Sequence, residues 1–143
     1  MATTRAATVA WQGGLVFEAL TATGHSLEMD ASPEHGGEHR GPSPMELLLA
    51  GLGGCTGMDV ISILRKMRQK VTAYRVEVRG SRRAEHPQIY TKIQLEHVVR
   101  GRGLDSKQVA RAVELSATRY CSASAMLGAM ARLEHSYRIE AEE

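Results

Sequence analysis

Three short apolar runs near the N-terminus alternate with turn-forming residues. Residues 4–11 and 15–20 flank Gln12-Gly13-Gly14, and residues 25–29 form a third run. β-Prone runs on either side of a glycine turn are typical of a hairpin. The N-terminal segment therefore predicts two hairpin strands followed by a third strand.

Two later segments show the period of two that half-buried strands have. Tyr74, Val76 and Val78 alternate with charged residues over 73–79, and apolar positions recur in the same way over 89–96. This period places one side of each strand against a core. We expect the strands to meet antiparallel, with a last strand over 136–141.

Three helices are predicted between and after these strands. The longest begins at Ser43-Pro44-Met45-Glu46, where serine is the N-cap, proline takes the first helical position and glutamate completes a capping box, and it runs to about residue 69. A helix over 105–119 opens with Asp105 and Gln108 in the same capping form, and one of its faces carries Val109, Ala112, Val113 and Ser116. A short helix over 122–131 follows. The order βββαββααβ predicts an α+β fold with the helices on one side of an antiparallel sheet.

The 43–69 helix has an unusual distribution of apolar and glycine residues. Leucine, methionine, valine and isoleucine surround it on every face, which indicates a central helix that is buried all round. It also contains Gly51, Gly53, Gly54 and Gly57, each of which costs ~1 kcal/mol in a helix interior. Close approach of a second backbone would offset that cost. We therefore expect a homodimer in which two such helices pack together.

The length and charge of the chain narrow its class. Its 143 residues fit a single domain over 1–143, and the net charge of +2 comes from interspersed basic and acidic residues, so nucleic acid is not an expected partner. We expect no leader, no apolar run of membrane-spanning length and no membrane partner. Two distant cysteines do not make a secreted disulfide framework, so the sequence predicts thiols in the cytoplasm.

The two cysteines are the main candidates for chemistry, and the alternative is that both are small buried hydrophobes. Cys121 falls where one predicted helix ends and the next begins, and a helix N-terminus favours a thiolate. Cys55 lies well inside its helix and needs a cation from elsewhere in the fold. Arg40 and Arg119 are the candidates for that cation.

Two carboxylates of the long helix have different relations to Cys55. At 100° per residue, Asp59 lies on the Cys55 face one turn further on, whereas Glu46 lies on the opposite face. Glu46 is therefore either a capping residue or part of a site built with another subunit. Asp59 alone would oppose a thiolate, but paired with an arginine it would position that cation beside the sulfur. The alternative for Asp59 is a buried carboxylate held by structural hydrogen bonds.

One string resembles a metal motif. His35-Gly36-Gly37-Glu38-His39 matches the H-x-x-E-H pattern of inverted zinc proteases, which requires both histidines on one helix face. Here two glycines separate them and Pro33 precedes them, so the segment reads as a loop over a nearby site. The other histidines, His97 and His135 among them, show no ligand spacing and are expected on the surface or in strands. No metal and no cofactor are expected.

Two separate motifs carry a resemblance to a known family. The stretch from Gly41 through Pro44 to Gly53-Gly54-Cys55 resembles the signature of the OsmC/Ohr superfamily, the osmotically inducible protein C-like proteins. Asp59-Val60-Ile61-Ser62-Ile63-Leu64 and Tyr120-Cys121-Ser122-Ala123-Ser124 resemble its YhfA-like branch. The resemblance covers essentially the whole chain.

This resemblance implies an intertwined homodimer with sheets wrapped around the central helices and two sites at the interface. It also implies a stress-response redox function, in which the cysteine matching Cys55 attacks an organic hydroperoxide and forms a sulfenic acid. The cysteine matching Cys121 then resolves that acid as a disulfide, and a thiol reductant of unknown identity restores both thiols. In such peroxidases an arginine and a glutamate polarise thiol and peroxide.

The sequence departs from this pattern at two positions. The family glutamate directly follows the proline matching Pro44, where this chain has Met45, and only Arg5 and Arg40 precede Cys55. Arg40 is chosen by elimination, with Asp59 as its partner in place of the glutamate. The expected function is a peroxiredoxin-like hydroperoxide reductase acting on small apolar hydroperoxides. The alternatives are a non-enzymatic module that binds a small hydrophobic ligand or senses oxidants, and a structural dimer with inert thiols.

Overall fold

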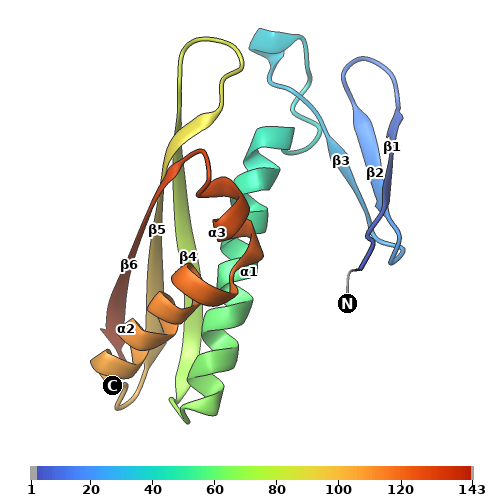
Figure 1. Cartoon of the computed structure of the whole chain (residues 1–143). Helices are drawn as coiled ribbons and strands as arrows, with labels where there is room; N and C mark the ends of the chain where they lie inside the picture. The colour runs from blue at the N-terminus through green and yellow to red at the C-terminus, as the bar shows by residue number, and fades with distance from the viewer. Residues whose placement is uncertain (1–2, 143) are drawn as a thin grey trace. The chain divides into compact units, whose positions relative to one another are not determined.

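The computed structural model describes residues 3–142 and contains two compact units, Met1–Leu48 and Leu49–Glu143 (Figure 1). The predicted single domain over 1–143 stays a prediction. The order of the elements is β1-β2-β3-α1-β4-β5-α2-α3-β6, with short additional turns before α1 and between α2 and α3. The predicted α+β order βββαββααβ is confirmed.

The first unit contains a three-stranded antiparallel sheet. Strands β1 (Ala7–Trp11), β2 (Phe17–Thr21) and β3 (Ser26–Met29) pair in sequence order. The β1–β2 turn needs Gly13 and Gly14, whose φ angles of +105° and +56° lie in the region that favours glycine. The predicted hairpin is therefore confirmed.

Helix α1 (Pro44–Lys66) begins in the first unit and forms the central helix of the second. Its start is the predicted capping box. The Glu46 amide donates to Ser43 Oγ at 3.2 Å, and the Ser43 amide donates to Glu46 Oε1 at 3.2 Å. Glu46 thus acts as a capping residue.

The second unit packs its helices on one side of a sheet. Strands β4 (Val71–Arg82), β5 (Tyr90–Gly101) and β6 (Arg132–Ala141) form it in that order, and α2 (Ser106–Leu115) and α3 (Ser122–Leu127) lie on the same side as α1 (Figure 1). A π-helical turn, η2 (Ser116–Tyr120), joins α2 to α3. Residues from α1, β5 and α2 form the core: Val60, Leu64, Val99, Val109, Ala112 and Val113.

The pairing of the last strand corrects one prediction. β4 and β5 are antiparallel, as expected, but β6 runs parallel to β5, with Ile93 opposite Leu133 and Val99 opposite Ile139. The reason is the connection, because α2, η2 and α3 cross over the sheet between β5 and β6 and return the chain in the same direction.

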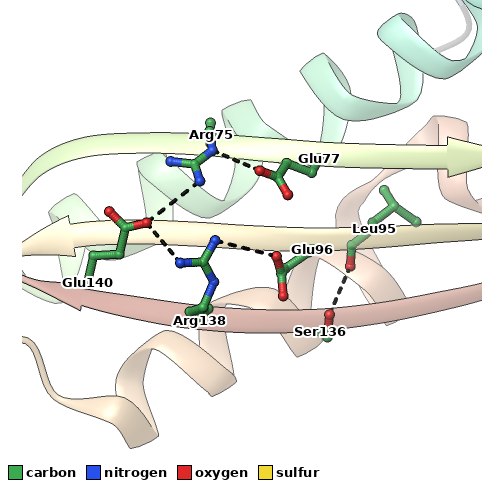
Figure 2. Close-up of polar contacts among 7 residues, drawn as sticks. All are labelled: Arg75, Glu77, Leu95, Glu96, Ser136, Arg138 and Glu140. Carbon is green, nitrogen blue, oxygen red and sulfur yellow. Dashed lines mark hydrogen bonds and ion pairs between the residues drawn. The ribbon is translucent and has the colours of Figure 1, made fainter.

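Ion pairs cover the other face of this sheet, as Figure 2 shows. Glu140 pairs with Arg75 at 3.6 Å and with Arg138 at 2.9 Å. The register places Val98 between these two arginines, and Val98 is only 2% exposed. The arginine stems therefore shield Val98 while their charged ends stay in water. Because the pairs are half-exposed, packing contributes more here than charge.

In the single chain α1 is buried on one side only. Its buried stripe is formed by Leu52, Thr56, Val60 and Leu64 at a spacing of four, while Met58 on another face is 74% exposed. The sheet and α2 cover this one side, and the burial of the other faces in a homodimer stays a prediction.

The length and hydropathy of α1 together correct the prediction about membrane-spanning segments. Its most apolar window has a mean hydropathy of 1.8, so by length and composition alone the helix is sufficient to cross a membrane. The expectation that no segment reaches this length and hydropathy is wrong. The core helix of a soluble protein meets the same criterion, and α1 supplies Val60 and Leu64 to the core described above.

Candidate functional site

The second unit brings Cys55 and Cys121 together. Cys55 lies in the middle of α1 and is partly exposed, whereas Cys121 lies between η2 and α3 and is 4% exposed. Both are free thiols, and Cys55 lies near enough to raise the pKa of the Cys121 thiol. Two neighbouring thiols at different depths form a redox-capable pair, with Cys55 the more accessible to a substrate.

The surroundings of Cys121 favour its neutral form. Burial raises the pKa of the Cys121 thiol, contacts with Ser124 lower it, and the neighbouring Cys55 thiol raises it again. Cys121 is the N-cap of α3, as predicted, and its Sγ accepts a hydrogen bond from the Ser124 amide at 3.3 Å. The expectation that this helix end favours a thiolate is nevertheless wrong, because α3 has only six residues and the sulfur is buried.

A hydrogen-bonded cluster lies one turn beyond Cys55. Ser116 Oγ donates to Asp59 Oδ2 at 2.9 Å and lies 2.7 Å from Thr56 Oγ1. Thr56 and Ser116 are fully buried. Asp59 is therefore held by a serine of η2, and this matches the structural alternative considered for it.

Arg40 has a different environment. Its Nη2 lies 3.2 Å from both Glu28 carboxylate oxygens, and its side chain is half-exposed. The buried Asp30 fixes the loop that carries Arg40 by accepting hydrogen bonds from the amides of Glu38 and Arg40. Asp59 and Arg40 thus have partners in separate units, and their pairing stays a prediction. Arg119 stacks on Tyr120, with Cζ 5.5 Å from the ring centroid.

The histidines of the metal-like string lie in a loop, as predicted. His35 ends a short 3₁₀ turn and its Nδ1 pairs with Ser32 Oγ at 2.9 Å, while His39 has a φ of +54°. Among residues 3–142, no group of three potential metal ligands converges.

Three aromatic side chains, of which His97 is buried and Tyr74 and His135 are partly buried, form a chain across the second sheet. Tyr74 Oη lies 2.7 Å from His97 Nδ1, and His97 Nε2 lies 3.3 Å from His135 Nδ1. Burial, together with the charge of Asp59, raises the pKa of Tyr74 above its usual range. Burial, and then His135, lowers the pKa of His97 to about 4. His97 and His135 lie in strands β5 and β6, one of the two locations expected for them, and His97 is fully buried there.

A signal for the missed residues exists in the sequence. His97 continues the alternation of Ile93 and Leu95 on the buried face of β5, and Thr56 continues the four-residue spacing of Leu52 and Val60. A polar residue on an apolar face needs a hydrogen-bond partner. Extending the predicted strand beyond residue 96 would have included His97.

An open apolar groove of about 720 Å³ lies between α1 and β4. Its lining includes Gly53, Gly54, Gly57 and Met58 but neither cysteine. An added Cβ at Gly53 would meet Val78 of β4 at 3.1 Å, whereas one at Gly54 would meet nothing within 4 Å. One glycine therefore allows β4 to pack against α1, and the other faces open space.

The fold is α+β, and it carries one thiol on the central helix α1 and the other on the connection between α2 and α3. These features define a class of proteins with a thiol pair on an α+β fold. The chain belongs to the OsmC-like protein family, whose model matches residues 36–136 and thus parts of both units.

Named relatives place the chain more closely within this family. Protein YhfA of Escherichia coli strain K12 is 44% identical over 135 residues, covering 94% of this chain and 98% of that protein. A hypothetical protein from Aquifex aeolicus has a TM-score of 0.88 at 33% identity, covering 99% of this chain and all of the other. An organic hydroperoxide resistance protein from Elizabethkingia anophelis has a TM-score of 0.75 at 15% identity over 98% and 99% of the two chains, which shows a shared fold.

Proposed function

We propose that this protein is a thiol-dependent reductase of small apolar organic hydroperoxides, with Cys55 as nucleophile and Cys121 as resolving thiol. The proximity of the two thiols is the observation that carries the proposal: Thr56, next to Cys55, lies 2.7 Å from Ser116, whose carbonyl accepts from the Cys121 amide. Its family also includes proteins named for organic hydroperoxide resistance.

In the first step the Cys55 thiolate attacks the terminal oxygen of the hydroperoxide and the O–O bond breaks. The alkoxide leaves, takes up a proton and departs as the alcohol, and Cys55 becomes a sulfenic acid. Sulfur is oxidised by two electrons and the peroxide is reduced by two. The partial exposure of Cys55 suits this step, since the substrate must reach its sulfur.

In the second step the Cys121 sulfur attacks the Cys55 sulfur and the S–O bond breaks. As the Cys121 sulfur attacks, its proton passes to the leaving hydroxyl, which departs as water, so the sulfur reacts with thiolate character. A thiol neutral before the attack, as burial makes Cys121, carries the required proton. An external dithiol then reduces the disulfide by exchange and is itself oxidised.

Arg40 is proposed as the cation that stabilises the Cys55 thiolate, with Asp59 as its partner. Hydrogen bonds from the amides of Glu38 and Arg40 to the Asp30 carboxylate hold the backbone of the loop that carries Arg40. The position from which the Arg40 side chain extends is therefore fixed. Charge on an arginine persists at every relevant pH.

A cytoplasmic homodimer is proposed as the working form. The exposed Met58, the open face at Gly54 and the apolar groove beside them form a surface suited to a second copy of α1. On the N-terminal sheet Trp11 is 67% exposed and Leu20 49%, which leaves further apolar area to cover. Cytoplasmic reductants would keep both thiols reduced between turnovers.

One equivalent of an alkyl hydroperoxide followed by mass spectrometry tests the chemistry. We expect a loss of two hydrogens and a peptide in which Cys55 is linked to Cys121. Unmodified thiols after this treatment would contradict the proposal. Met45 at the position of the family glutamate favours an oxidant sensor as the second candidate. A sensor would form the same disulfide once but would not consume excess hydroperoxide with a dithiol reductant present.

A further inference from the structure

In the cluster of Thr56, Ser116 and Asp59 beside the thiols, the direction of each hydrogen bond follows from which groups can donate a proton. An ionised Asp59 carboxylate only accepts, so the single Ser116 hydroxyl proton points to Asp59 Oδ2 at 2.9 Å. Thr56 Oγ1, 2.7 Å from Ser116 Oγ, must then donate to it. In this arrangement the Thr56 hydroxyl donates to Ser116 and the Ser116 hydroxyl donates to Asp59, so both hydroxyl protons have an acceptor. The bond to the Asp59 carboxylate is charge-assisted.

This cluster is connected to both cysteines. Thr56 directly follows Cys55 in α1, and Ser116 is the first residue of η2. The Ser116 carbonyl accepts the amide proton of Cys121 at 2.9 Å, which closes the π-helical turn. Ser116 therefore attaches to α1 through its side chain and to Cys121 through its backbone.

We infer that Asp59 and Ser116 are positioning residues, which fix η2 against α1 so that the sulfur of Cys121 stays beside Cys55. A π-helical turn has few stabilising bonds of its own and is frequent at functional sites. The hydrogen bond from its first residue, Ser116, to the Asp59 carboxylate of α1 sets where its last residue, Tyr120, places Cys121. The inference rests on the proposed function only in that hydroperoxide reduction would give the disulfide between Cys55 and Cys121 its purpose.

A thiol–disulfide equilibrium measures this positioning without any hydroperoxide. Oxidised glutathione takes two electrons from Cys55 and Cys121, giving the protein disulfide and two molecules of glutathione. The equilibrium constant reports how well the two thiols are held for bond formation. A substitution that destabilises the reduced and the oxidised protein equally leaves this constant unchanged, so a merely structural role does not move it.

The variants are Asp59→Asn, which keeps the shape and removes the charge, and Ser116→Ala, which removes the hydroxyl. Both are expected to lower the equilibrium constant roughly tenfold, the effect of one charge-assisted hydrogen bond. Ser116→Thr, which keeps the hydroxyl, should recover most of the loss. Thr118→Val is the matched control, because Thr118 belongs to the same turn but donates to the Glu114 carbonyl at 2.8 Å, on the exposed side.

The outcomes separate this inference from the proposed function. Constants for Asp59→Asn and Ser116→Ala equal to that of Thr118→Val would overturn the positioning role, even in a protein that consumes hydroperoxide. A tenfold loss in a protein that forms the disulfide but consumes no hydroperoxide supports the positioning role and contradicts the proposed reductase. A wild-type protein that forms no intramolecular disulfide in glutathione would overturn both.

Discussion

The Tyr74 hydroxyl lies 2.7 Å from Nδ1 of His97, in the interior of the second unit. The two rings are stacked, with centroids 6.0 Å apart, and His97 stacks in turn on His135 at 5.5 Å. His135 Nε2 is buried without a hydrogen-bond partner among residues 3–142. A proton added to either imidazole would create a buried positive charge with no acceptor for the extra N–H group. The environment therefore favours the neutral form of both histidines.

Acid should destabilise the protein through His97. Burial lowers the pKa of His97 from 6.5 to about 4, so between these values the unfolded chain binds the proton that the folded chain does not. The stabilisation is fully present above pH 6.5 and is lost as the pH falls towards 4, by roughly 3 kcal/mol for this one group. Burial lowers the pKa of His135 as well, in the same direction. Urea unfolding at a series of pH values across this window measures the slope.

His97→Gln should flatten that slope, because glutamine does not titrate. His25→Gln is the control, since His25 lies exposed beside the β2–β3 turn, where its Nδ1 lies 3.0 Å from Thr23 Oγ1. Equal slopes for His97→Gln and the wild type would show that another group is responsible.

The two cysteines should respond differently to substitution. Cys55→Ser is expected to abolish hydroperoxide consumption, because it removes the attacking sulfur. Cys121→Ser should still allow one oxidation, which stops at the sulfenic acid or proceeds to higher acids because no thiol resolves it. Consumption assays and intact mass after one equivalent distinguish the two. Normal activity in Cys55→Ser would exclude Cys55 from the mechanism.

Local patterns predicted the elements because they depend on neighbours in sequence. The Ser43–Glu46 capping box is present as predicted, since both hydrogen bonds lie within one turn. The second predicted capping box, at Asp105, forms only one of its two expected hydrogen bonds. Asp105 accepts from the Lys107 amide at 2.9 Å, but the Asp105 amide donates to Gln69 at 2.8 Å and not to Gln108. A residue distant in sequence took the place of the local one.

Long-range relationships of the site were harder to predict. Ser116 was placed correctly on the buried face of its helix, but its partner Asp59 lies on another element, and no sequence pattern joins them. The π-helical turn also replaced the last turn of the predicted 105–119 helix. The proximity of Cys55 and Cys121 was expected from resemblance to a family, because periodicity alone gives no distance between elements.

A substitution at Gly54 should separate dimer formation from folding. No atom lies within 4 Å of a Cβ added there, so Gly54→Leu fits the single chain and favours the helix by ~1 kcal/mol. The same side chain would obstruct a second copy of α1 packed on that face. Sedimentation equilibrium should show a wild-type dimer at micromolar concentration and a weaker dimer for Gly54→Leu. Lys66→Ala, at the end of α1 and outside the groove, is the control. A folded wild-type monomer at that concentration would contradict the proposed dimer.

The proposed role of Arg40 predicts a change in the reactivity of Cys55. In a Cys121→Ser background the rate of Cys55 alkylation follows the fraction of thiolate, so its pH midpoint reports the charges that act on the sulfur. Arg40→Ala removes the proposed cation and leaves the Asp59 carboxylate one turn away, so the midpoint should rise by roughly one pH unit. Asp59→Asn should change it less, because it frees the arginine but also removes a negative charge. Arg65→Ala, an exposed arginine at the end of α1, is the matched control for the loss of one positive charge. An unchanged midpoint in Arg40→Ala would exclude Arg40 and make Arg119, which stacks on Tyr120 next to Cys121, the next cation to test.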